Sequence, residues 1–137
     1  MVRRVHHINF IVRDLEAAVG RYEEILDMPV TSRDHLDERG VDIARFRLGE
    51  TWIVLLQPTR SDTEPARFLA AHGEGFFLMS LEVDSLADEA SRLGTEMVRG
   101  SERAGLDDWR VMDLDPGKTH GAQLQWVVTG QQKTPGG

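Results

Sequence analysis

The feature that most constrains this chain is a strand–helix–strand pattern that occurs twice. Sliding the sequence over itself by 71 residues places Val12 on Val83, at the end of the first strand of each copy. The same offset places Ile53, from a late strand of the first copy, on Leu124. Because one offset aligns both the beginning and the end of the pattern, we interpret the chain as an internal duplication.

Hydrophobic periodicity predicts the elements of each copy. The expected strands cover residues 5–12, 42–49, 51–58, 76–83, 108–115 and 122–128, with one further strand in each copy. The expected helices cover residues 13–26, 64–73 and 84–94, with Asp14 capping the first and Ser85 and Asp88 forming a capping box in the last. We therefore predict one α+β domain over residues 1–137, built from modules 5–57 and 76–128, with a flexible tail at 129–137.

Composition excludes several classes of protein. The net charge of −7 argues against a nucleic-acid partner or an anionic membrane surface. The chain has no cysteine, which excludes disulfides and thiolate metal sites. No apolar run approaches the length of a membrane span, and the first residues do not form a long apolar segment. We expect a cytoplasmic protein.

The strand faces that point away from the helices mix polar and apolar side chains. Successive side chains of a strand point to opposite faces, so each predicted strand divides into two sets. The set facing away from the helices contains His7, Asn9, Trp52, Val54, Leu78, Ser80, Glu82, Gln123 and Gln125. A half-apolar face with a few polar groups favours a small-molecule cleft, and a partly wet sheet face or a subunit interface is the alternative.

Several segments resemble one family in order and spacing: "VHHINFIVRDLEAAVGRYEEIL", "ERGVDIARFRLGETWIVLLQP", "FLAAHGEG", "LEVDSL" and "LDPGKTHGAQLQWV". The chain resembles the vicinal oxygen chelate superfamily of glyoxalases, bleomycin-resistance proteins and extradiol dioxygenases, and among these it is most similar to methylmalonyl-CoA epimerases. The resemblance implies two tandem βαβββ modules whose curved mixed sheet surrounds a cleft. It also implies a homodimer.

The resemblance further implies four positions at which metal-bound members hold one divalent cation. In this chain those positions carry His7, Val54, Leu78 and Gln125. Val54 and Leu78 have no lone pair to donate, and Gln125 offers only a neutral amide oxygen. We therefore expect no cofactor. The alternative is a divalent metal held by His7 and Gln125 within a rearranged ligand set to which Glu82 could contribute.

The expected function is that of a divergent, glyoxalase-like or epimerase-like protein that binds an organic small molecule. Its catalytic candidates are His7 as acid or base, Gln125 as a hydrogen-bond donor to a developing oxyanion, and Glu82. Asn9, Trp52, Val54, Leu78, Ser80 and Gln123 are expected to contact the ligand. Metal-independent isomerase or lyase chemistry, a metal-dependent epimerase or lactoylglutathione lyase, and a bleomycin-resistance-type sequestering protein stay open. The sequence does not name the ligand.

Overall fold

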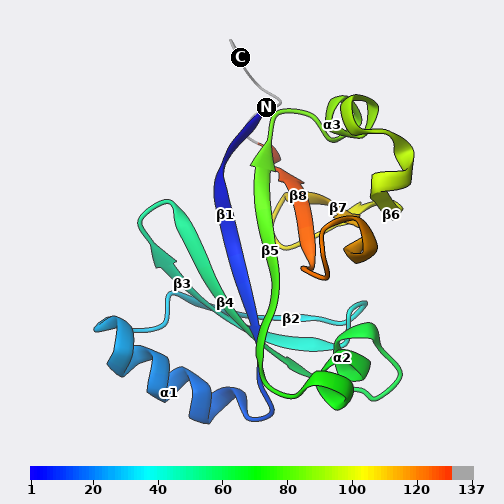
Figure 1. The fold of residues 1–137 in the computed structure, drawn as a ribbon. Coiled ribbons are helices and arrows are strands. Elements are labelled where there is room, and N and C mark those ends of the chain that lie inside the picture. The colour runs from blue at the N-terminus through cyan, green and yellow to red at the C-terminus, as the bar shows by residue number, and fades with distance from the viewer. Residues whose placement is uncertain (131–137) are drawn as a thin grey trace. The chain divides into compact units, whose positions relative to one another are not determined.

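The computed structural model describes residues 1–130, where it contains eight β-strands and three α-helices. In chain order these are β1 (Val2–Ile11), α1 (Leu15–Leu26), β2 (Ser32–Leu36), β3 (Val41–Leu48), β4 (Thr51–Pro58), α2 (Glu64–His72), β5 (Gly75–Val83), α3 (Leu86–Leu93), β6 (Val98–Ala104), β7 (Arg110–Leu114) and β8 (Leu124–Val128) (Figure 1). This order confirms the α+β class and the two βαβββ modules, with α2 between them. The expected tail lies outside the described residues from position 131 onward.

The described chain divides into two compact units, one of residues 7–77 and one that joins residues 1–6 to residues 78–130. In the unit of residues 7–77 the strand order is β2-β3-β4-β1, with β1 parallel to β4 and the other neighbours antiparallel. Helix α1 packs its apolar stripe on one face of these strands. That core contains Val12, Leu15, Val19, Ala44, Phe46 and Leu55.

The second unit repeats this arrangement with the strand order β5-β8-β7-β6, in which β5 runs parallel to β8. Helix α3 packs on one face of these strands. The core there contains Val83, Leu86, Leu114 and Trp126, with Leu81, Leu124 and Val128 packed against it. The face of each strand that packs on the helix is therefore the face expected from alternation.

The register of the two parallel pairs supports the duplication. Asn9 pairs with Val54 in β1 and β4, and Ser80 pairs with Gln125 in β5 and β8. Each of the second pair is 71 residues beyond its counterpart (80 − 9 and 125 − 54). Because a slip of one residue would turn every side chain to the opposite face, the shared register places equivalent positions on equivalent faces.

Local capping follows the sequence signals. The side chain of Asp14 accepts a hydrogen bond from the N–H of Ala17, and that of Ser85 accepts one from the N–H of Asp88. Gly73 ends α2 with φ at +80°, a conformation that a side chain would strain. The ends of the strands differ more from the prediction. β1 begins three residues before the expected residue 5, because its polar start is held by ion pairs rather than by apolar packing.

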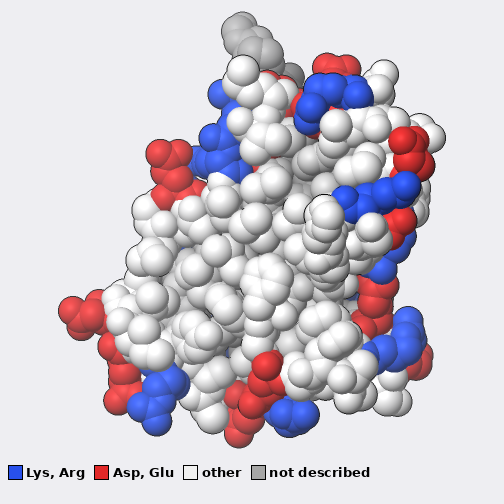
Figure 2. All heavy atoms as spheres, in the orientation of Figure 1, with Lys and Arg blue, Asp and Glu red and all other residues white. Residues whose placement is uncertain are grey.

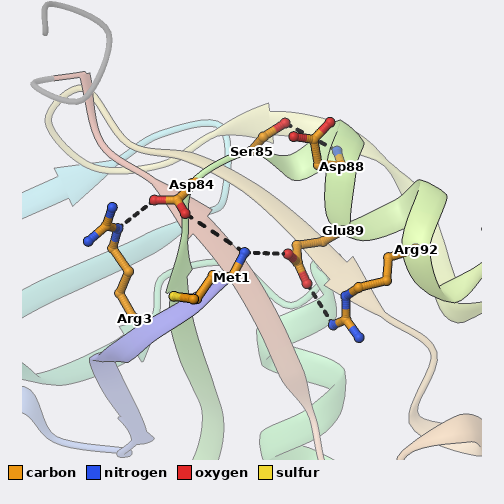
Figure 3. A network of polar contacts seen from close by, with 7 residues as sticks. All are labelled: Met1, Arg3, Asp84, Ser85, Asp88, Glu89 and Arg92. Atoms are coloured by element: carbon orange, nitrogen blue, oxygen red, sulfur yellow. Dashed lines mark hydrogen bonds and ion pairs between the residues drawn. The ribbon is translucent and has the colours of Figure 1, made fainter.

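Those ion pairs join the start of β1 to the α3 region of the same unit (Figure 3). The ammonium group of Met1 donates to Oε2 of Glu89 at 2.9 Å, and Arg92 donates to Oε1 at 2.7 Å. Arg3 donates to Asp84 at 2.5 Å. Glu89 is only 2% exposed, so its charge depends on these two cationic partners. The ammonium group first, and then Arg92, lowers the pKa of Glu89 below its ordinary value.

Charged side chains of both signs occur on the face that Figure 2 draws. On the face drawn in Figure 2, acidic and basic side chains of the described residues lie beside each other. Within residues 1–130, no helix is both long and apolar enough to cross a membrane.

We expect Glu89→Gln to lower the free energy of unfolding at pH 7 by about 1 kcal/mol, since both cationic partners are solvent-exposed and screened. Because the folded carboxyl has a lowered pKa, its contribution is present above the ordinary value of 4.5 and is lost as the pH falls through the folded pKa. Urea unfolding at pH 7 and pH 4 measures this, and the gap between the two proteins should narrow at pH 4. A gap that is equal at both pH values would contradict the ionic role of Glu89.

Candidate functional site

On the face of the first unit opposite α1, strand register brings together side chains that are distant in sequence. Ser32 pairs with Arg45, Arg45 with Val54, and Val54 with Asn9, so these four residues form one row across β2, β3, β4 and β1. The neighbouring row contains Arg47, Trp52 and His7. The catalytic candidate His7 and three residues expected to contact the ligand, Asn9, Trp52 and Val54, therefore lie on one face.

Arg45 is the most unusual residue of this face, because its charged side chain is only 5% exposed. Its guanidinium stacks on the ring of Trp52, with 4.5 Å between Cζ and the ring centroid. Its Nε donates to Oγ of Ser32 at 3.1 Å. Its Nη2 lies 3.4 Å from Oδ2 of Asp34, but that oxygen is buried and has no hydrogen-bond partner. The Arg45–Asp34 contact is thus longer than a tight, bidentate arginine–carboxylate pair.

Asn9 contributes a second buried polar group to this face. Its Oδ1 is buried and has no hydrogen-bond partner. A buried oxygen that accepts no hydrogen bond costs about 1–3 kcal/mol, so such atoms in a folded protein call for an explanation. A ligand donor at this position would satisfy it.

The equivalent face of the second unit, opposite α3, carries a row with different chemistry. Ser80 pairs with Gln125, Gln125 with Asp113, and Asp113 with Arg99. Nε2 of Gln125 donates to Oδ1 of Asp113 at 3.0 Å, and Arg103 donates to both oxygens of that carboxylate. This chain of contacts orients the Gln125 amide. Ser80 is fully buried, and its Oγ has no hydrogen-bond partner.

The remaining expected residues of the second unit have varied surroundings. Glu82 is 4% exposed and accepts a hydrogen bond from Nε of Arg4 at 2.5 Å, so its carboxylate holds the start of β1 within that unit. Leu78 is buried and Gln123 is half-buried. The other histidine of the opening strand, His6, is buried against Trp109 with 4.7 Å between ring centroids.

Sequence reasoning missed Arg45 and Asp113, which occupy equivalent places in the two rows. The hairpin turn between β3 and β4 pairs Leu48 with Thr51, and that register alone places Arg45 opposite Val54. Applying the alternation rule across this turn would have put Arg45 on the predicted face. The sequence gives less indication of where Asp113 lies. The connection between β7 and β8 is long, so no short turn sets the register between these two strands.

The acidic segment after α1 is partly a strand. Asp34 and His35 lie in β2, and Asp34 points to the Arg45 side. His35 is exposed, and its hydrogen bonds to Asp42 and then Asp37 raise its pKa above the ordinary value. Asp34 is therefore the carboxylate of this segment that the fold brings to the candidate site.

Comparison with known proteins agrees with this architecture. Residues 6–112 match the model of the glyoxalase/bleomycin resistance protein/dioxygenase superfamily. A Streptomyces coelicolor methylmalonyl-CoA epimerase variant in complex with 2-nitronate-propionyl-CoA superposes with a TM-score of 0.86 at 26% identity, covering 95% of this chain and 99% of that one. The expected glyoxalase-like fold is thereby confirmed.

Two curated relatives are also epimerases. The human mitochondrial methylmalonyl-CoA epimerase is 32% identical over 97 residues, which are 70% of this chain and 55% of that protein. The ethylmalonyl-CoA/methylmalonyl-CoA epimerase of Cereibacter sphaeroides is 27% identical over 130 residues, covering 91% and 97% of the two chains. This chain spans about half the length of the human relative. It belongs to the glyoxalase/bleomycin resistance protein/dioxygenase superfamily, close to its methylmalonyl-CoA epimerases.

These relatives correct one expectation. Methylmalonyl-CoA epimerases of this family are metal-dependent, so the expectation that no cofactor is involved is wrong. It rested on the missing donors at Val54 and Leu78 and on the neutral amide at Gln125. Those donors are indeed missing from this chain, and no group of three or more His, Cys, Asp or Glu within residues 1–130 is placed to hold a metal ion. The described side chains therefore do not form a fitting ligand set by themselves.

Ser80→Ala should raise the free energy of unfolding by about 1 kcal/mol, because it removes a buried hydroxyl that accepts and donates no hydrogen bond within the described protein. Urea unfolding measures the change. Ser85→Ala is a suitable contrast, since it removes a helix cap and should destabilise by a similar amount. A loss of stability in Ser80→Ala would show that the hydroxyl has a partner in solution.

Proposed function

We propose that this protein binds an acyl-coenzyme A ester whose acyl group carries a carboxylate, and that it exchanges the hydrogen next to the thioester carbonyl. The relatives named above support the substrate class, since they are epimerases of methylmalonyl-CoA and a structural neighbour holds a coenzyme A ester. The observation that carries the proposal is Arg45, a buried guanidinium on the face that also bears His7 and Asn9.

Arg45 suits the acyl carboxylate for physical reasons. A guanidinium presents donors in a planar fork that matches the two oxygens of a carboxylate. Trp52 and Ser32 hold the group in place, which reduces the entropy lost when a ligand binds. The Asp34 side chain is 36% exposed and lies 3.4 Å from Arg45, so a ligand carboxylate is proposed to replace it beside the guanidinium.

The other side chains of the face have separate roles in the proposal. Asn9 Oδ1 accepts a hydrogen bond from an N–H or O–H group of the ligand, which satisfies its buried oxygen. His7, buried on the neighbouring row, is the group proposed to take up or release the proton at the carbon next to the carbonyl. In the second unit, Asp113 orients the amide of Gln125, and Gln125 stays a predicted hydrogen-bonding residue of that unit. The homodimer and the cytoplasmic location stay predictions.

Arg45→Met should abolish discrimination between carboxylated and uncarboxylated ligands. Isothermal titration calorimetry would compare methylmalonyl-CoA with propionyl-CoA, which lacks the carboxylate. We expect the wild type to prefer methylmalonyl-CoA by about 10- to 100-fold, and the variant to bind both equally. Arg21→Met on the exposed surface of α1 is the matched control and should keep the preference. Retained preference in a folded Arg45→Met would contradict the assignment.

Turnover is tested by incubating methylmalonyl-CoA in D₂O and following deuterium uptake next to the carbonyl by mass spectrometry. The incubation is run with no added metal and with Mg²⁺, Mn²⁺, Co²⁺, Ni²⁺ or Zn²⁺, against a blank without protein. We expect protein-dependent exchange that falls at least tenfold in His7→Gln while binding persists. Stoichiometric binding without exchange under every condition would instead favour the sequestering alternative, for which the aromatic wall of Trp52 is suited.

A further inference from the structure

A groove at one end of the first unit has no part in the face described above. It is open to solvent, has a volume of about 410 Å³ and lies where the parallel strands β1 and β4 both end. Arg13 lines it just beyond β1, and Thr59, Arg60 and Ser61 line it just beyond β4. Leu69, with neighbouring alanines of α2, supplies an apolar wall. Guanidiniums and hydroxyls can donate hydrogen bonds to phosphate oxygens, and an apolar wall can contact a base, so this lining suits a nucleotide.

Arg60 is held in place by two hydrogen bonds. Its Nη1 donates to the backbone carbonyl of Asp37 at 2.7 Å, and its Nε donates to Oδ1 of Asp62 at 3.0 Å. Its Cζ also lies 3.0 Å from where a Cβ on Gly40 would stand. Position 40 has φ of +64°, which favours glycine, and a side chain there would also crowd the guanidinium. The side chain is therefore preorganised, which lowers the entropy cost of binding an anion.

The carboxylates near the groove do not prevent anion binding. Arg13 lies 3.9 Å from Glu74, with side chains 62% and 50% exposed. The Asp62 side chain that pairs with Arg60 is 76% exposed. Exposed pairs of this kind are worth about 0–1 kcal/mol, so a doubly charged phosphate can recruit both guanidiniums at little cost. An arginine has five N–H donors and can bind a phosphate while keeping a second partner.

We propose that this groove binds the phosphate groups of a nucleotide, and that in the setting of the proposed function it holds the nucleotide end of the coenzyme A ester. This inference rests on the proposed function for the identity of the whole ligand. The four residue-to-residue steps from Val54 to Pro58 span about 13 Å along β4. An extended pantetheine arm, which links the thioester to the phosphates, bridges such a distance. One ligand can therefore reach both Arg45 and the groove.

The test is calorimetric titration of the full chain and of the double variant Arg13→Gln/Arg60→Gln. The probes are methylmalonyl-CoA, adenosine 3′,5′-bisphosphate and the N-acetylcysteamine thioester of methylmalonate, which has no phosphate. We expect the double variant to bind both phosphorylated probes at least tenfold more weakly, with an unchanged affinity for the truncated thioester. Arg21→Gln, on exposed α1, is the matched control and should bind all three as the wild type does.

The outcomes separate this inference from the proposed function. If the double variant, with an unchanged thermal unfolding midpoint, binds the phosphorylated probes as tightly as the wild type, the groove assignment is wrong. The same holds if the wild type binds the truncated thioester but neither phosphorylated probe. If the wild type binds only the bisphosphate, and the double variant loses that binding, the groove is a phosphate site and the proposed acyl ligand is wrong. Weakening of all three probes to the same extent would show a general structural effect and overturn the assignment.

Discussion

The parallel register between β1 and β4, repeated between β5 and β8, is the constraint on which the rest of the structure depends. In each unit this register places one face of the strands against the apolar side of a helix. The opposite face carries both polar and apolar side chains. A slip of one residue would bury Asn9 under α1 and expose Leu55, at a cost of several kcal/mol in lost apolar burial. The candidate site is therefore a consequence of core packing, because the same register that buries the helix faces also places the functional groups.

The two units use equivalent positions for opposite charges. In the first, Arg45 follows Val54 in the row. In the second, Asp113 follows Gln125 and is neutralised by Arg103. Each buried charge has neighbours that lower its cost: an indole ring and a hydroxyl for Arg45, an amide and a guanidinium for Asp113. The two units thus share a backbone frame, while the equivalent rows carry a buried cation in one and a buried anion in the other.

Membership of the family establishes the fold. Whether this chain can bind a metal or a ligand depends on its individual side chains. Relatives of this chain are metal-dependent epimerases, which overturns the expectation that no cofactor is involved. Yet two of the four positions that correspond to the ligand set carry Val54 and Leu78, whose side chains have no donor atoms. The lesson from the cofactor prediction is that missing donors describe one chain's side chains and do not by themselves exclude a family's cofactor. In the proposed function, Arg45 supplies a ligand-binding charge that lies beside those four positions.

The sequence by itself determined the duplication, the helices with their caps, and the face on which His7, Asn9 and Val54 lie. These features depend on local periodicity and on capping groups within a few residues of each other, so they can be read along the chain. The tertiary structure alone decided that Asp34 approaches Arg45, that Gln125 is oriented by Asp113, and that Arg13 and Arg60 line one groove. Each of these depends on pairing between strands or loops that are distant in sequence, where register and side-chain reach, rather than local pattern, decide which groups meet.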